Sequence, residues 1–223
     1  MNKMTVSPLF SLSSDGPVAA STRHEDLVHL RQGDIDGACG PYCLCMALLA
    51  LGLFRRADLS DMDRWDGRTR EGRFRDSLLA FGALVSEGTW GEELVWLTDF
   101  FKSKGLIARP SDGKKSGIFQ ELVEAIDEGA APIVGVRWHG GGGHWLLVVG
   151  YQGVEIDGDL QLTHLLCLDP GQETPRTSLW NAVIEVFQRD GSAINRGSLS
   201  SDHWGLSGAI TKCHIEESVI LSI

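Results

Sequence analysis

The chain has 223 residues, of which 43% are hydrophobic, and this is enough to form the core of a single folded domain. Its formal net charge of -10 at pH 7 disfavours nucleic acids and anionic membrane surfaces as partners, because both would repel it. The sequence has neither an apolar run near the ~18 residues of a membrane helix nor a secretory signal, so we expect a cytoplasmic protein without a membrane partner.

The chain begins with an irregular stretch and continues into a strongly apolar one. Residues 1–24 mix Ser, Pro, Gly and Asp without periodicity, so we expect an arm or loop ahead of a domain that covers residues 25–223. Residues 42–51 are apolar on all sides and end at Gly52, which predicts a helix buried in the core. Pro41 suits the first position of that helix, since it lacks an N–H that the helix does not need there.

Three further helices are expected in the first half of the chain. The polar, arginine-rich stretch 58–87 has apolar residues that suggest one short helix around Phe74 and Leu78, and the rest should be surface. Residues 90–104 place apolar side chains at helical spacing and end at Gly105. Residues 118–128 form another amphipathic pattern.

The period then changes to that of strands. Residues 131–138, 144–151 and 162–168 are short, β-branched runs joined by turn sequences, which predicts consecutive antiparallel strands. For the tail we expect a helix around residues 179–188, a Ser/Gly-rich loop and a final strand at residues 218–223. Helices followed by an antiparallel sheet define an α+β layout, with the buried helix packed on the sheet.

The cysteines indicate both a compartment and a candidate site. An odd number without disulfide-like spacing favours a reducing compartment; the residues are Cys39, Cys43, Cys45, Cys167 and Cys213. Most lie within apolar runs, where a thiol acts as a small hydrophobe. Cys39 instead stands between a glycine-rich loop and the buried helix, where backbone N–H groups and the helix dipole favour a thiolate. Its sulfur is therefore a candidate nucleophile.

A thiolate nucleophile requires a group that moves protons, and His144 is the best candidate. It opens a predicted strand directly after four glycines, whereas its rival His139 follows a strand. Asp169 ends the next predicted strand, so pairing of the two strands would let its carboxylate orient the imidazole. Gln32, seven residues before Cys39, offers an amide donor for an oxyanion.

These motifs resemble a known family when they are taken together. Gln32, the Cys39-Gly40-Pro41-Tyr42 helix start, His144-Trp145 and Leu168-Asp169-Pro170-Gly171 are similar to motifs of the papain-like cysteine peptidases, most of all the bacterial bacteriocin-leader (double-glycine) peptidases. The resemblance covers about residues 30 to 172. It implies a papain-like fold with Cys39 as nucleophile, His144 as base, Asp169 as orienting carboxylate and Gln32 in the oxyanion hole.

We therefore expect hydrolysis of an amide or thioester bond in a peptide or protein substrate. A deamidase or acyltransferase would use the same residues up to the acyl-enzyme. A third alternative is a catalytically silent binding module, in which Cys39 is a structural thiol, His144 a strand residue and Asp169 a turn residue. No cofactor or metal is expected, because Cys39, Cys43 and Cys45 would diverge around a helix instead of converging on zinc.

Overall fold

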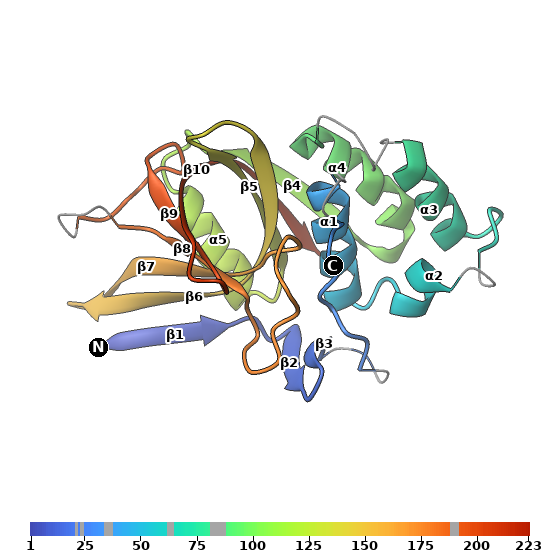
Figure 1. Ribbon diagram of the computed structural model, residues 1–223, viewed down its shortest axis with the longest axis horizontal. Coiled ribbons are helices and arrows are strands. Elements are labelled where there is room, and N and C mark those ends of the chain that lie inside the picture. Colours follow the sequence, from blue (N-terminus) through green and yellow to red (C-terminus); the bar gives the residue numbers. More distant parts are fainter. Residues whose placement is uncertain (21, 23–24, 34–37, 62–64, 81–87, 188–191) are drawn as a thin grey trace.

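The computed structural model is a mixed α/β protein with helices α1 to α4 gathered at one end and, at the other, a strand-built body that also holds α5 (Figure 1). The structure describes residues 1–20, 22, 25–33, 38–61, 65–80, 88–187 and 192–223. The helices are α1 (Cys39–Ala50), α2 (Arg56–Ser60), α3 (Arg70–Ala80), α4 (Gly91–Thr98), the 3-10 helix η2 (Asp99–Lys104) and α5 (Ile118–Asp127). The strands are β1 (Asn2–Val6), β2 (Phe10–Ser13), β3 (Gly16–Ala19), β4 (Ile107–Asp112), β5 (Ala131–Trp138), β6 (Gly143–Ile156), β7 (Asp159–Leu168), β8 (Ala182–Glu185), β9 (Ser201–Gly205) and β10 (Ile210–Ser222).

The main sheet is antiparallel and closes on itself. Its path runs β6-β5-β10-β9-β8-β7, and β7 also pairs with β6, so these six strands form a barrel. Two strands extend it at the margins, since β1 pairs with β6 and β4 pairs with β10. The expected combination of helices with an antiparallel sheet is confirmed, and barrel closure leaves these strands few open edges.

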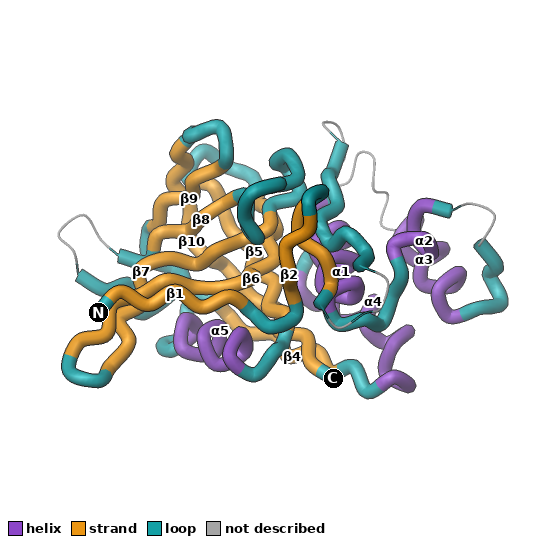
Figure 2. The backbone as a smooth tube through the Cα atoms, turned by 90° about the horizontal axis from the view of Figure 1, so that it is seen from below, coloured by secondary structure: helices purple, strands orange, loops and turns teal. Residues whose placement is uncertain are grey.

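Two apolar cores hold these layers together. In the first, α1 packs against one face of β5 and β6, with residues such as Leu44 and Leu48 completely buried against Leu147. In the second, the apolar face of α5 packs with side chains of barrel strands such as Val134 and Leu146. Figure 2 shows α5 lying under the barrel and α1 beside it. Both faces of β5 and β6 are therefore covered, which explains their nearly continuous apolar sequences.

The helical predictions largely hold. The buried helix forms as α1 but begins at Cys39, so Pro41 is its third residue instead of its first. The helix expected at 90–104 divides into α4 and η2 and ends at Gly105, whose φ of 86° is left-handed. The short helix around Phe74 is α3, and 118–128 forms α5. Neither α2 nor β4 was expected.

The strands at 131–138, 144–151 and 162–168 form as β5, β6 and β7, with the last two longer than expected. The helix expected at 179–188 is wrong, because β8 occupies Ala182–Glu185. Its burial alternates with a period of two residues, and its backbone pairs with both β7 and β9. The final strand begins earlier than expected and forms β10, while β9 lies in the presumed loop.

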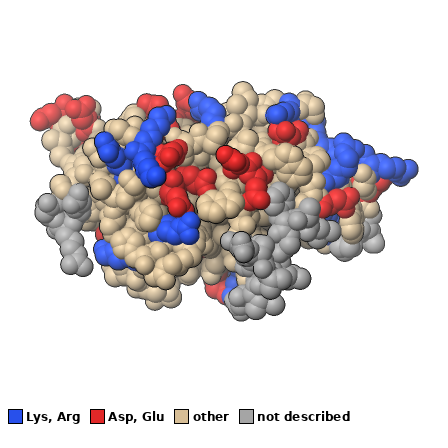
Figure 3. Space-filling model, turned by 90° about the horizontal axis from the view of Figure 1, so that it is seen from above, with Lys and Arg blue, Asp and Glu red and all other residues tan. Residues whose placement is uncertain are grey.

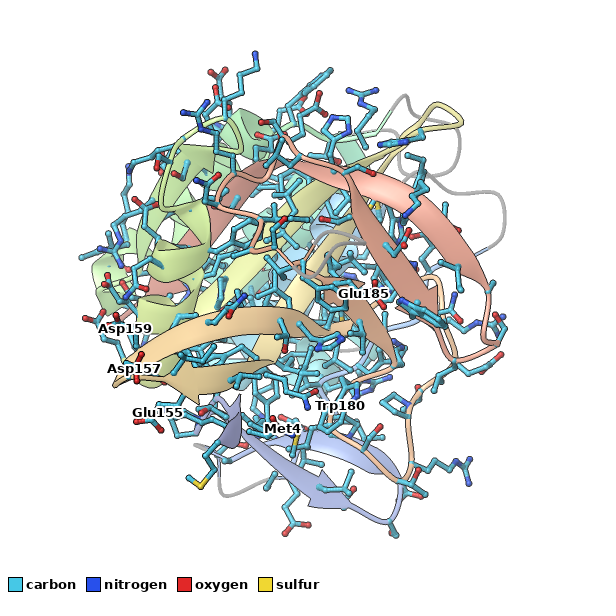
Figure 4. All side chains as sticks on the ribbon, turned by 90° about the vertical axis from the view of Figure 1, so that its left-hand side faces the viewer. Met4, Glu155, Asp157, Asp159, Trp180 and Glu185 are labelled. Atoms are coloured by element: carbon cyan, nitrogen blue, oxygen red, sulfur yellow. The ribbon has the colours of Figure 1, made fainter. Side chains whose placement is uncertain are left out.

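The expectation of an irregular arm over residues 1–24 is also wrong. Residues 2–6 form β1 because their backbone groups pair with β6 from Gly150 to Val154. Figure 4 looks at this end of the molecule, with Met4 on β1 near Glu155 and the β6–β7 turn. Backbone pairing needs no side-chain periodicity, which is why the sequence pattern did not indicate this strand. Among the described residues, no helix is long and apolar enough to cross a membrane.

Candidate functional site

Cys39 is the first residue of α1, and its side chain lines an open pocket. The residue is only 6% exposed. Its position in the first helical turn places the sulfur at the positive end of the helix dipole, which favours a negative charge there. The candidate nucleophile is thus largely buried but still lines a pocket that opens to solvent.

His144 lies on the wall of the same pocket, on the second residue of β6. Its Nε2 is 2.6 Å from Oδ1 of Asp169. An ionised carboxylate only accepts hydrogen bonds, so Nε2 carries a hydrogen and donates it, and the other ring nitrogen, Nδ1, remains for Cys39. Burial by itself would lower the pKa of His144, but hydrogen bonds with Asp169 and with Cys39 outweigh it and raise the pKa to about 10. The imidazole is therefore stabilised as a cation.

Asp169 follows directly after β7 and is 2% exposed. The pairing of Leu147 with Leu168 brings the start of β6 beside the end of β7, as the sequence predicted. Burial would raise the pKa of this carboxyl group, but the hydrogen bond with His144 and the close contact of His203 hold it well below its usual range. Gly171 adds a backbone donor, with its N 2.7 Å from Oδ1. Asp169 is thus a buried carboxylate held in its ionised form.

A second layer of buried polar groups fixes the backbone of Asp169. Asn181 accepts a hydrogen bond from the Asp169 N–H at 2.6 Å and donates one to its carbonyl oxygen at 2.9 Å. Nε2 of His29 lies 2.9 Å from the same carbonyl oxygen and 3.1 Å from Nδ2 of Asn181, and it carries a hydrogen in the tautomer that donates to the carbonyl oxygen. Nδ1 of His29 then accepts from the hydroxyl group of Thr174, at 2.8 Å. Burial lowers the pKa of His29, which keeps this ring neutral.

The pocket around Cys39 and His144 is small, at about 90 Å³. One wall is held by Trp145, whose indole N–H donates to the carbonyl oxygen of Thr89 at 2.7 Å. Gly40 makes this approach possible, because an added Cβ would lie 3.0 Å from Thr89 and 3.1 Å from Trp145. The pocket therefore admits only a narrow substrate group to the sulfur of Cys39.

Two acidic residues line part of the same pocket. A bulge in β10 between Ile215 and Glu217 lets Glu216 and Glu217 both face it. Glu216 pairs with Arg137 at 2.9 Å, whereas Glu217 accepts from the Gly91 N–H at 3.1 Å. Burial raises the pKa of Glu217. Figure 3 shows acidic side chains gathered near the middle of the molecule seen from above.

The remaining predicted positions have different surroundings. Gln32 does not line the pocket with Cys39 and His144; its backbone N–H instead donates to the carbonyl oxygen of Pro170 at 2.8 Å. Its role in an oxyanion hole stays a prediction. His139, the rival of His144, lies against His214, with ring centroids 6.0 Å apart, and is absent from the pocket wall. Residues 34–37, part of the stretch that precedes Cys39, lie outside the described residues.

The other cysteines are sharply different from Cys39. All five are free and buried, but none of the other four lines the pocket. Burial raises the pKa of each of these four thiols, which disfavours their reactive thiolate forms; they are Cys43, Cys45, Cys167 and Cys213.

Sequence reasoning missed the residues that support the site. His29, Asn181 and His203 contact Asp169 from segments far apart in the chain. Each is a single polar residue in a stretch without a local motif, so only the tertiary structure indicates its role. No protein-family model matches the chain, and no curated protein matches its sequence.

Proposed function

We propose that this protein is a cysteine hydrolase that cleaves an amide or thioester bond of a peptide or protein, with a papain-like arrangement of Cys39, His144 and Asp169. The observation that carries the proposal is the orientation of His144, which shares a pocket with Cys39 while Asp169 binds its far nitrogen at 2.6 Å. A strand histidine in a purely structural role has no need of both contacts.

In the proposed reaction the Cys39 thiolate attacks the carbonyl carbon of the substrate, and the carbonyl π electrons move to oxygen. Collapse of this tetrahedral intermediate breaks the bond from carbon to the leaving nitrogen or sulfur. The His144 imidazolium gives its Nδ1 proton to the leaving group, so an acyl group remains on sulfur. Water then attacks that acyl group, His144 takes the water's proton, and the carbon–sulfur bond breaks to restore the thiolate.

Asp169 supports these steps without exchanging a proton. Its carboxylate fixes the tautomer of His144 and stabilises the imidazolium that exists alongside the thiolate. The narrow approach beside Gly40 favours an extended substrate with small side chains near the scissile bond. Gln32 would join the backbone at the start of α1 as an oxyanion donor in this scheme.

Two further expectations belong to the same proposal. The free, buried state of all five cysteines supports a reducing compartment, so we infer a cytoplasmic location. The net charge of -10 supports a peptide or protein substrate in preference to a nucleic acid. We keep residues 25–223 as the proposed peptidase domain and residues 1–24 as an N-terminal arm, of which β1 adds a strand to the sheet of that domain.

Two experiments test the proposal. In the first, the intact protein is treated with iodoacetamide at neutral pH and each cysteine is read by mass spectrometry. We expect Cys39 to label much faster than the other thiols and to slow in His144→Ala. The matched control is Cys43→Ala, which removes a buried thiol one turn along α1 and should leave Cys39 labelling unchanged. Equal, slow labelling of all five cysteines would identify a silent binding module.

In the second experiment, a peptide library made from a digested proteome is incubated with wild type or with Cys39→Ala. New peptide termini that appear only with wild type support the hydrolase. Conversion of glutamine to glutamate without new termini, or acyl groups moved to amines, would instead assign a deamidase or acyltransferase. Equal cleavage by Cys39→Ala would rule out the mechanism.

A further inference from the structure

A second histidine contacts the carboxylate of Asp169 on the side away from His144. His203 lies on β9, is 6% exposed and places its Nε2 3.2 Å from Oδ2 of Asp169. That nitrogen is buried and has no aligned hydrogen bond among the described residues, so the carboxylate is the anion within its reach. Asp169 therefore lies between two imidazoles, with one oxygen facing each.

Trp138 contacts the rings of both His144 and His203. Its indole stacks on His144, with centroids 5.8 Å apart and planes at 25°, and meets His203 edge-on at 5.2 Å. The indole covers the histidine–aspartate cluster from β5, while β9 and the end of β7 supply the other walls. A water-poor surrounding of this kind strengthens each electrostatic contact.

We infer that His203 is a positioning residue of the proposed hydrolase, an Nε2–H donor that holds Asp169 in the orientation that stabilises the His144 imidazolium. The inference rests on the proposed function, because it concerns the same reactive cysteine.

The titratable groups around His203 come from several elements. Asp169 faces it from the end of β7, and His144 lies beyond that carboxylate on β6. On β9 and β10, Asp202 and Lys212 pair with each other. His29 lies on the backbone side of Asp169, and burial lowers its pKa. The contact with a charged group that carries the inference is thus the one between His203 and Asp169.

Removal of the donor should act on Cys39 through Asp169 and His144. Without it, Oδ2 of the buried carboxylate is less well stabilised and less firmly held, so Asp169 supports the imidazolium less and the thiolate forms at higher pH. In His203→Leu we expect the pH profile of Cys39 alkylation to move upward by about half to one pH unit, with up to a tenfold slower reaction on its acid side.

The test measures iodoacetamide alkylation of Cys39 against pH in wild type, His203→Leu, His203→Gln and the control Asp202→Asn. Glutamine keeps an N–H donor at a similar reach, so His203→Gln should restore the wild-type profile, and Asp202→Asn should leave it unchanged. A residue that only stabilises the fold would lower the amount of reactive protein without moving the profile. Superimposed profiles for His203→Leu and wild type would overturn the inference.

A second measurement tests the inference about His203 even if His203→Leu does not fold. In wild-type protein labelled with ¹⁵N-histidine, long-range NMR correlations report which nitrogen of each ring carries hydrogen. We expect the ring of His203 to carry a hydrogen on Nε2, and a hydrogen on Nδ1 alone would overturn the inference. Wild-type Cys39 that labels no faster than the other cysteines overturns the proposed function instead, so the two failures are distinguishable.

Discussion

The charge state of His144 provides the sharpest test of the site. Its pKa is raised from 6.5 to about 10 because hydrogen bonds with Asp169 and Cys39 outweigh the effect of burial. In Asp169→Asn the charged acceptor is lost. A hydrogen bond to a charged group contributes about 1.5–3 kcal/mol, and one pKa unit corresponds to about 1.4 kcal/mol. The pKa of His144 should therefore fall by about one to two units in this variant.

The assay is a ¹⁵N-histidine NMR titration between pH 5 and 11, a range that extends about one unit above the His144 transition expected in wild type and about three units below the lowest one expected in the variant. Wild-type His144 should stay protonated through neutral pH, and Cys39→Ala should also lower its pKa by removing a partner. His29 is the internal contrast, since burial lowers its pKa and it should be neutral throughout most of the range. A wild-type His144 that titrates near 6.5 would refute the reasoning.

Further predictions concern stability and access. Asn181→Ala leaves the buried N–H of Asp169 without its partner and removes one of the donors to its carbonyl oxygen, so it should lower the free energy of unfolding by about 2–4 kcal/mol in urea titrations; an effect below about 0.5 kcal/mol would contradict this. Gly40→Ala places a methyl group 3.0 Å from Thr89. Alkylation of Cys39 should therefore slow while the fold is retained. An unchanged rate would show that Thr89 and its neighbours move aside to accommodate the methyl group. The raised pKa of His144 implies stability that is fully present below pH 6.5 and lost as the pH rises towards about 10. The stability difference between wild type and His144→Gln should therefore shrink over that range, at up to about 1.4 kcal/mol per pH unit, and a pH-independent difference would contradict the assignment.

Sequence patterns located the parts of the site that depend on local structure. Cys39 at a helix start, His144 at a strand start and Asp169 at a strand end are all positions that periodicity and turn residues mark. Strand pairing then brings the last two together without further information. The predicted juxtaposition of His144 and Asp169 therefore followed from the correct assignment of two strands.

The parts that sequence could not predict depend on backbone pairing or on isolated polar residues. β1 forms because β6 offers partners for its N–H and C=O groups, and β8 forms where a helix was predicted because β7 and β9 flank it. Tertiary context overrides local propensity in such short segments. His203 and Asn181 act through an aspartate more than ten residues away in the chain, and single-residue patterns do not encode such partners.

The closure of the barrel has a consequence for the newly made chain. The pocket needs residue 39 from α1 and residues 216 and 217 from β10, so its walls do not exist before β10 has been synthesised. During that interval the thiols of α1 lack the burial that later protects them from oxidation. Contacts between such distant segments also form slowly, which lengthens the exposure. In a nascent chain of this design the thiols of α1 therefore stay open to oxidation until β10 has docked.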